Sequence, residues 1–210
     1  MENGIKLKRI QAAILTLPDG QTVHVERIGR GRYSTAWKNG TSVYVQTHEK
    51  DLGKELLCNI SETPHLPLIT HLETSGIYNW YKMPLYQKLT AKHKEAWADF
   101  RHLQRLQDSA FKEERAVIGY GKESNPANVN SLFLSKVEED VHLTESGYAD
   151  AIGALGSWCG SYGGTWLIER LQARNCAVDA HGRLILLDPV FDLAEVRAEQ
   201  EKRRKRARGY

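Results

Sequence analysis

The chain has 210 residues, of which 41% are hydrophobic and 26% charged, enough to build one domain or two small lobes around a buried core. Its formal net charge of +3 is uneven, because residues 195–210 carry seven Lys/Arg and three Asp/Glu whereas the rest holds 22 basic and 23 acidic residues. No apolar run approaches the roughly 20 residues of a membrane helix, which excludes an integral membrane protein and favours a soluble, unexported one.

The three cysteines, Cys58, Cys159 and Cys176, are far apart and form no CxxC pair. The histidines show no ligand spacing with them, so the sequence does not indicate a zinc site. An odd number of scattered cysteines predicts free thiols in a reducing compartment, and we therefore expect a cytoplasmic protein.

The first half of the chain predicts an antiparallel meander. Residues 12–29 alternate as a strand, a Pro-Asp-Gly turn and a second strand, with Val23 and Val25 on one face. Residues 29–46 continue with a Gly-rich turn and two strands joined at Asn39-Gly40. The leucine spacing of residues 50–60 predicts a helix, and residues 77–89 predict a strand that runs out into an extended segment.

The second half predicts mainly helices. One helix follows Thr90 as its N-cap, residues 123–130 form a loop, and another helix starts at Tyr148 and ends at Gly163-Gly164. Two short strands at Val178 and 184–187 then surround a turn. The chain ends in a charged helix in which Glu199/Arg203 and Glu201/Lys205 are spaced for ion pairs.

These elements predict an α+β fold with two lobes. We expect an N-lobe over residues 1–82 with a small antiparallel sheet, a Gly-rich loop and one helix. A hinge over 83–89 would lead to a helical C-lobe over 90–192 that carries a β-hairpin. Residues 193–210 would form a basic helical tail.

Three segments carry a resemblance to a known family: GRGRYSTAW (29–37), NCAVDAHGRLILLDPV (175–190) and AEQEKRRKRARG (198–209). Their order, from about Gln21 to Asp192, resembles a minimal protein kinase. Within that family the chain is most similar to the early serine/threonine kinase of podophages that encode their own RNA polymerase. Those proteins share the Gly-x-Gly-x-aromatic-Ser loop, the Asn-hairpin-Asp order and a basic end.

The resemblance implies roles for individual residues. ATP contacts fall on Gly29, Gly31, Ser34, Val45, Gln46 and Met83. Glu55 matches the helix Glu that holds the phosphate-binding lysine, and Asn175 and Asp188 match the ligands of Mg²⁺, a cation that prefers oxygen.

Two positions depart from the family pattern. The strand that should carry the lysine reads Val43-Tyr44-Val45-Gln46, so the lysine slot holds Val45, or Gln46 in a shifted register. Arg170 stands where the catalytic Asp should accept the substrate proton, and an arginine cannot accept one. Glu169 is a possible substitute as base, and Lys50, Lys54, Arg30 or Arg32 could replace the missing positive charge.

Three functions follow as hypotheses. The first is a pseudokinase of a bacteriophage that binds a host protein, either RNA polymerase or a defence protein, during early takeover of the host cytoplasm. The second is an active, atypical serine/threonine kinase that uses ATP and Mg²⁺. The third is a nucleic-acid-associated protein that binds through basic residues 197–208.

Overall fold

The computed structural model describes residues 12–17, 20–31, 33–49, 51–60, 62–119, 125–161 and 165–207. The chain divides into two compact units. The first comprises residues 1–61 and 68–85, and the second comprises residues 62–67 and 86–210. Lys50, Arg32 and Gly163-Gly164, which the sequence singled out, lie outside the described residues.

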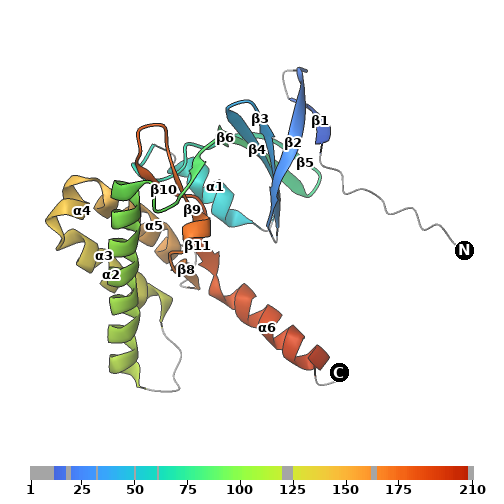
Figure 1. Cartoon of the computed structure of the whole chain (residues 1–210). Helices are drawn as coiled ribbons and strands as arrows, with labels where there is room; N and C mark the ends of the chain where they lie inside the picture. Colours follow the sequence, from blue (N-terminus) through green and yellow to red (C-terminus); the bar gives the residue numbers. More distant parts are fainter. Residues whose placement is uncertain are drawn as a thin grey trace, which may run out of the picture. The chain divides into compact units, whose positions relative to one another are not determined.

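The first unit is a six-stranded antiparallel sheet with one helix (Figure 1). The strands are ordered β1-β2-β3-β4-β6-β5. The elements are β1 (Ala12–Thr16), β2 (Thr22–Arg30), β3 (Ser34–Asn39), β4 (Ser42–His48), α1 (Leu52–Asn59), β5 (Thr70–Ser75) and β6 (Tyr78–Pro84). The predicted meander and the helix after it are confirmed.

Helix α1 lies on the sheet face that carries Val45 and Tyr81. Val45 pairs with Tyr81 across β4 and β6, and both side chains are buried. Burial, together with the charges of Cys58, Glu55 and Asp51 in and before α1, raises the pKa of Tyr81 to about 12. The helix buries Leu56 and Leu57 completely, so apolar burial on this face holds the first unit together.

Strand β5 was not predicted. Its sequence, THLETS, is polar, and at the edge of the sheet its side chains are exposed or half-buried. A strand at a sheet edge needs no alternation of apolar residues, so the sequence carried no signal for it.

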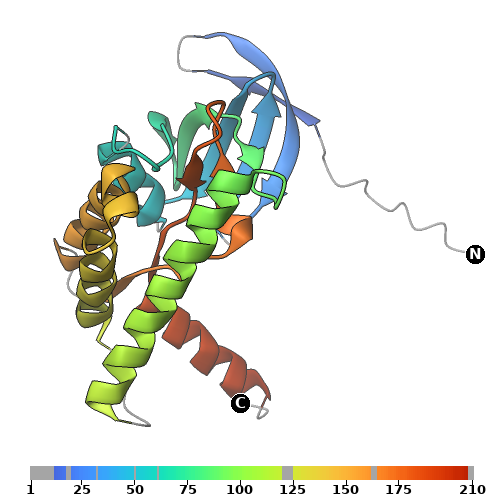
Figure 2. The same ribbon diagram turned by 60° about the vertical axis from the view of Figure 1, so that its left-hand side comes forward.

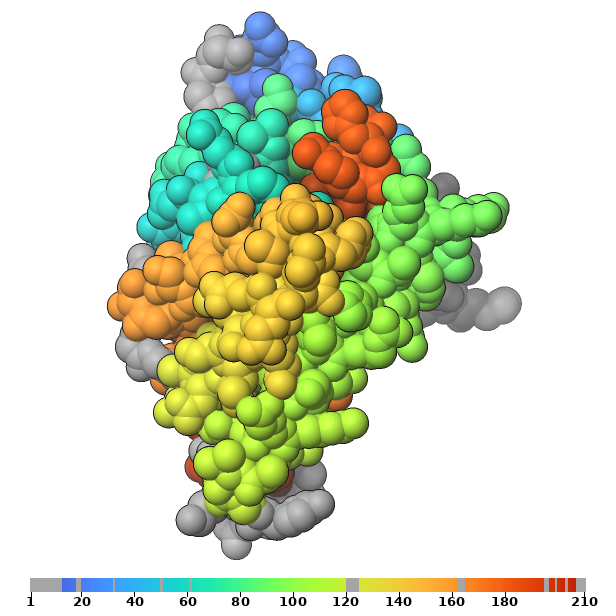
Figure 3. Space-filling view, turned by 90° about the vertical axis from the view of Figure 1, so that its left-hand side faces the viewer, coloured from blue at the N-terminus to red at the C-terminus, as the bar shows by residue number. Residues whose placement is uncertain are grey.

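The second unit is mainly helical (Figures 1 and 2). Its longest helix, α2, runs beside α3, and α3 in turn packs on α5. Figure 3 shows α2, α4 and the β9–β10 hairpin together on one face of this unit. Its elements are β7 (Gln87–Lys88), α2 (Lys94–Ile118), α3 (Pro126–Glu138), α4 (Val141–Glu145), α5 (Tyr148–Ser161), β8 (Trp166–Ile168), η1 (Ala173–Asn175), β9 (Cys176–Val178), β10 (Leu184–Leu186), β11 (Val190–Asp192) and α6 (Leu193–Ala207).

The α+β class is confirmed, since an antiparallel sheet with one helix comes first and a helical part with a β-hairpin follows. The residues predicted as a hinge, 83–89, contain the end of β6 and the short strand β7, which pairs with β9. None of the described helices is long and apolar enough to cross a membrane.

Two predicted boundaries in the second unit were wrong. The N-cap of α2 is His93, three residues after Thr90. Residues 126–130, predicted as loop, begin helix α3, where the Asn125 side chain accepts a 3.0 Å hydrogen bond from the Ala127 N–H. Asn at the N-cap followed by Pro at the first helical position is a helix-start signal, and the prediction missed it.

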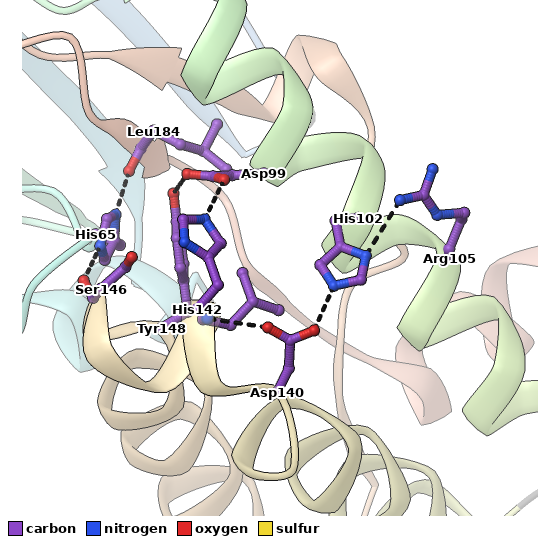
Figure 4. A network of polar contacts seen from close by, with 10 residues as sticks. His65, Asp99, His102, Arg105, Asp140, His142, Ser146, Tyr148 and Leu184 are labelled. Atoms are coloured by element: carbon purple, nitrogen blue, oxygen red, sulfur yellow. Dashed lines mark hydrogen bonds and ion pairs between the residues drawn. The ribbon is translucent and has the colours of Figure 1, made fainter.

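His65 fixes residues 62–67 to the second unit (Figure 4). Its Nδ1 lies 2.8 Å from the Leu184 carbonyl oxygen, and its Nε2 lies 2.7 Å from that of Ser146. The ring is buried and stacks on Tyr148 at 3.7 Å. The Tyr148 hydroxyl donates to Asp99 of α2 at 2.9 Å, so one chain of contacts joins β10, α5 and α2.

A second polar contact joins α2 to α4 (Figure 4). Asp140 caps α4 by accepting a hydrogen bond from the Leu143 N–H, and its other carboxylate oxygen lies 2.6 Å from His102 Nε2. These two hydrogen bonds, with that of His102 the larger effect, lower the pKa of Asp140. Helix α2 is therefore joined by polar contacts to both α4 and α5.

Candidate functional site

The β9–β10 hairpin sets the positions of Asn175 and Asp188. All residues of its two strands are buried, and its turn is closed by Asp179, whose side chain accepts hydrogen bonds from the N–H groups of His181 and Arg183. At the open end, the Leu187 N–H donates to the Asn175 carbonyl at 2.9 Å. The hairpin therefore brings Asn175 next to the residue that precedes Asp188.

Glu169 completes this cluster. Its carboxylate Oε2 accepts a 2.8 Å hydrogen bond from Nδ2 of Asn175. Its backbone N–H donates to the Pro189 carbonyl at 2.6 Å. Glu169, Asn175 and the Asp188-Pro189 pair are thus neighbours, and we call them the Glu169 cluster. Glu169 and Asn175 are half-buried, whereas Asp188 is exposed.

Arg170 turns toward helix α2. Its Nε donates a 2.8 Å hydrogen bond to Asp108, its Nη2 contacts the same carboxylate oxygen, and its guanidinium lies 5.9 Å from the centre of the Phe111 ring. Glu169 and Arg170 were the two residues considered for the base position. In the structure Glu169 lies beside Asn175, whereas Arg170 binds Asp108. An exposed ion pair of this kind contributes little to stability.

Two buried amides that the prediction missed hold the backbone around Glu169. Gln107 of α2, 1% exposed, accepts from the Leu171 N–H at 2.8 Å and donates to the Glu169 carbonyl at 3.0 Å. Asn130 of α3 accepts from the Ile168 N–H at 3.1 Å and donates to the Trp166 carbonyl at 3.2 Å. Gln107 occupies a core position of α2 between the buried apolar residues Leu103 and Ala110, and such a polar interruption was the available signal.

In the first unit, the Gly-rich turn closes tightly. The Gly31 N–H donates to the Ser34 carbonyl at 2.8 Å, and a Cβ on Gly31 would lie 2.9 Å from Ser34 Oγ. A larger residue at this position would therefore require the Ser34 side chain to move. Gly29 lies opposite Ala36 at a register shift and has ordinary room for a side chain.

The strand register shows which residues of β4 face helix α1. Val45 pairs with Tyr81 and Val43 pairs with Met83, so all four share the face that α1 covers. Gln46 points to the opposite face and is half-buried. Thr47, on the α1 face, is fully buried with a hydroxyl that has no partner among the described residues. Residues 43, 45 and 47 thus bring no positive charge to this face.

Helix α1 places its two charged residues differently from expectation. Glu55, expected to reach inward, is exposed, whereas Lys54, beside it in the sequence, is only 9% exposed. A lysine at this level of burial is normally paired. Lys54 is therefore the described lysine best placed to bring a charge into the interior of the first unit.

The chemistry of the Glu169 cluster suits a hard divalent cation. Carboxylate and amide oxygens are the ligands that Mg²⁺ and Mn²⁺ accept. Because Asn175 donates through Nδ2, its Oδ1 is the atom available to a cation. Within the described part of the chain, no three His, Cys, Asp or Glu side chains gather as a metal site. A cation held here would therefore depend on Asn175 and Asp188 together with ligands from a bound phosphate.

The sequence matches no protein-family profile, and no curated protein is similar to it. Two solved structures of WbdD show a partial likeness, a crystal structure at 2.2 Å and a complex with the kinase inhibitor LY294002. Each shares 11% identity and covers 82% of this chain and 34% of WbdD, with TM-scores of 0.35 and 0.33. This chain spans about a third of WbdD, and at these TM-scores the likeness carries no argument about function.

Proposed function

We propose that the chain is a kinase-like protein with impaired phosphoryl transfer, which acts mainly by binding another protein. The observation that carries this proposal is the register of β4. Its α1 face presents Val43, Val45 and Thr47, where a kinase needs the lysine that contacts the nucleotide phosphates. Without a charge aimed at the transferring group, transfer would be slower by orders of magnitude.

Under this proposal the Glu169 cluster retains a weak site for a divalent cation with ATP. Asn175 Oδ1 and the Asp188 carboxylate would hold the cation, and the Glu169 carboxylate would orient Asn175 through their 2.8 Å hydrogen bond. Gly31, Ser34 and Val45 are the proposed nucleotide contacts in the first unit. The partner proposed from the resemblance to phage kinases is a host protein, either RNA polymerase or a defence protein, in the host cytoplasm.

The second candidate is an active, atypical serine/threonine kinase. The contact between Glu169 and Asn175 favours it, because a carboxylate beside the cation-binding Asn can accept the proton of a substrate hydroxyl. Lys54 would then have to supply the positive charge that β4 lacks.

One experiment separates the two candidates. The protein is incubated with labelled ATP, Mg²⁺ or Mn²⁺ and a host lysate, beside an Asp188→Ala variant. If transfer is impaired, Mn²⁺ with ATP should raise the melting temperature of the protein. The wild type should then transfer no more labelled phosphate than the Asp188→Ala variant does. Label that disappears in Asp188→Ala would establish the active kinase. If ATP changes neither the melting temperature nor the amount of labelled product, the protein does not bind the nucleotide and both candidates are contradicted.

A further inference from the structure

The sheet of the first unit carries a groove on the face opposite Val45. The groove has a volume of about 420 Å³, and its wall includes Arg27, Arg30, Tyr33, Trp37, His48 and Tyr78. These residues come from β2, β3, β4, β6 and the Gly-rich turn, and the three strands β2, β3 and β4 lie side by side in Figure 1.

This groove differs from the nucleotide slot predicted from the kinase resemblance. Thr35 pairs with Gln46, and both line the groove, whereas the neighbouring pair Ala36 and Val45 points to the α1 face. Val45 and Met83 therefore do not contribute to it. It shares Gly31, Ser34 and Gln46 with the predicted nucleotide contacts, because these residues lie at the turn or on the groove face.

The groove is rich in hydrogen-bond donors. Arg27 and Arg30 line the groove, and among the described lining residues there is no Asp or Glu. Neither arginine forms an ion pair with another described residue. Such a set of donors is complementary to an anionic ligand rich in acceptors.

The groove is also rich in aromatic rings. Tyr33, Trp37 and Tyr78 lie in its wall together with His48, whose ring meets Tyr78 edge to face at 5.9 Å between centroids. Tyr78 is 40% exposed, so its ring is accessible to a ligand. Aromatic faces next to arginines are what unpaired bases and their phosphates bind in single-strand-binding proteins.

We propose that this groove binds single-stranded nucleic acid. Bases stack on the aromatic side chains, and phosphates contact Arg27 and Arg30. A double helix does not suit the groove, because its bases are already stacked on one another. The basic tail offers charge without aromatic residues, apart from Tyr210. This proposal is independent of the kinase-like function and needs no ATP.

The test measures fluorescence anisotropy of a labelled oligothymidylate of about 12 nucleotides with the full chain at low salt. The wild-type protein is expected to bind with an affinity that falls as salt rises. The Arg27→Gln/Arg30→Gln variant should bind about tenfold more weakly. Tyr78→Ala should bind about fivefold more weakly, because one stacking surface is lost.

The Arg204→Gln/Arg206→Gln variant removes the same charge from α6 and separates the groove from the basic tail: if the groove is the binding site, affinity should change less than about twofold. Arg27→Lys/Arg30→Lys keeps the charge and should retain most of the binding. Circular dichroism and melting curves show whether each variant is folded. Three results would overturn the proposal: no binding by the wild-type protein, an equal loss in the α6 control, or equal affinity for a duplex of the same length.

Discussion

The carboxylate of Glu169 and the side-chain amide of Asn175 form a 2.8 Å hydrogen bond in the second unit. This contact turns the amide so that Oδ1 is left for another partner. The backbone of Glu169 is fixed by Pro189 and Gln107. A carboxylate, an amide and the residues around Asp188 are thereby brought together, while the neighbouring Arg170 contacts α2.

Replacement of Glu169 by Gln tests the role of its charge. The amide of Gln can still accept from Asn175, so the free energy of unfolding should change by less than about 1 kcal/mol. Mn²⁺ binding should weaken about tenfold, because a residue that orients a ligand supports the affinity of that ligand. Any phosphoryl transfer should fall about 100-fold if Glu169 is the base. Urea unfolding measures the change in stability, calorimetry with Mn²⁺ and ATP measures the loss of Mn²⁺ affinity, and single-turnover labelling measures the loss of phosphoryl transfer.

Glu145→Gln serves as the matched control, since Glu145 is an exposed carboxylate on α4. It removes the same charge and should leave Mn²⁺ binding unchanged. If both variants bind Mn²⁺ as the wild type does, Glu169 has no part in a metal site and its contact with Asn175 serves only the loop.

Replacement of Gln107 by Leu should destabilise the second unit. Leu keeps a similar volume but leaves the Leu171 N–H and the Glu169 carbonyl without their side-chain partner. An unsatisfied buried polar group costs about 1–3 kcal/mol, so we expect a loss of about 2–4 kcal/mol in urea unfolding. Gln104→Leu removes a 3.0 Å bond to the Leu171 carbonyl and an exposed 2.9 Å bond from Arg101, and it should cost less because the Gln104 side chain is only half-buried. Equal losses in the two variants would show that Gln107 has no special role.

Much of the fold was predictable because its signals are local. Val43 and Val45 alternate on one face of β4, Leu56 and Leu57 follow helical spacing, and the residues between Asp179 and Arg183 form the expected turn. Each signal depends on residues a few positions apart, and the structure confirms all three elements. The ion pair between Glu201 and Lys205, 2.9 Å, was predictable for the same reason.

The arrangement of the Glu169 cluster was not predictable, because it depends on contacts between distant segments. Counting back from Asn175 identified Arg170 as the residue in the base position. The Arg170 side chain is instead directed by Asp108, and the backbone of Glu169 is held by Gln107, both of them on α2 and about 60 residues earlier in the chain. The inward position of Lys54 likewise depends on how α1 packs on the sheet.

Introduction of a lysine on β4 tests the strand register. Val45→Lys adds the charge on the α1 face, whereas Gln46→Lys adds it on the opposite face. Val45→Lys should lower the melting temperature, because burial of a lysine is unfavourable, and should increase the thermal shift caused by ATP with Mg²⁺. Gln46→Lys should leave both nearly unchanged. A larger ATP response from Gln46→Lys would mean that the nucleotide binds on the groove face.

The buried thiols make stability depend on alkaline pH. Burial raises the pKa of Cys159 and that of Cys176 from 9.0 to about 12, with the charge of Glu169 adding to the shift at Cys176. In the folded protein these thiols keep their protons above pH 9, where the unfolded chain loses them. Stability is therefore complete below pH 9 and decreases as the pH rises from about 9 toward 12. Urea unfolding across this range should show the decrease.

Thiol labelling gives a second readout of the same burial. At a pH of about 8 a thiol-specific reagent should modify both cysteines slowly in the native protein and rapidly in urea, because only the thiolate reacts and only the unfolded chain exposes it. The double variant Cys159→Ala/Cys176→Ala should lose most of the alkaline decrease in stability. Half-buried Cys58 remains in that variant as an internal reference, since burial also raises its pKa. Rapid labelling of Cys176 in the native protein would instead show that the β9–β10 hairpin opens readily, and with it the backbone that joins Asn175 to Leu187.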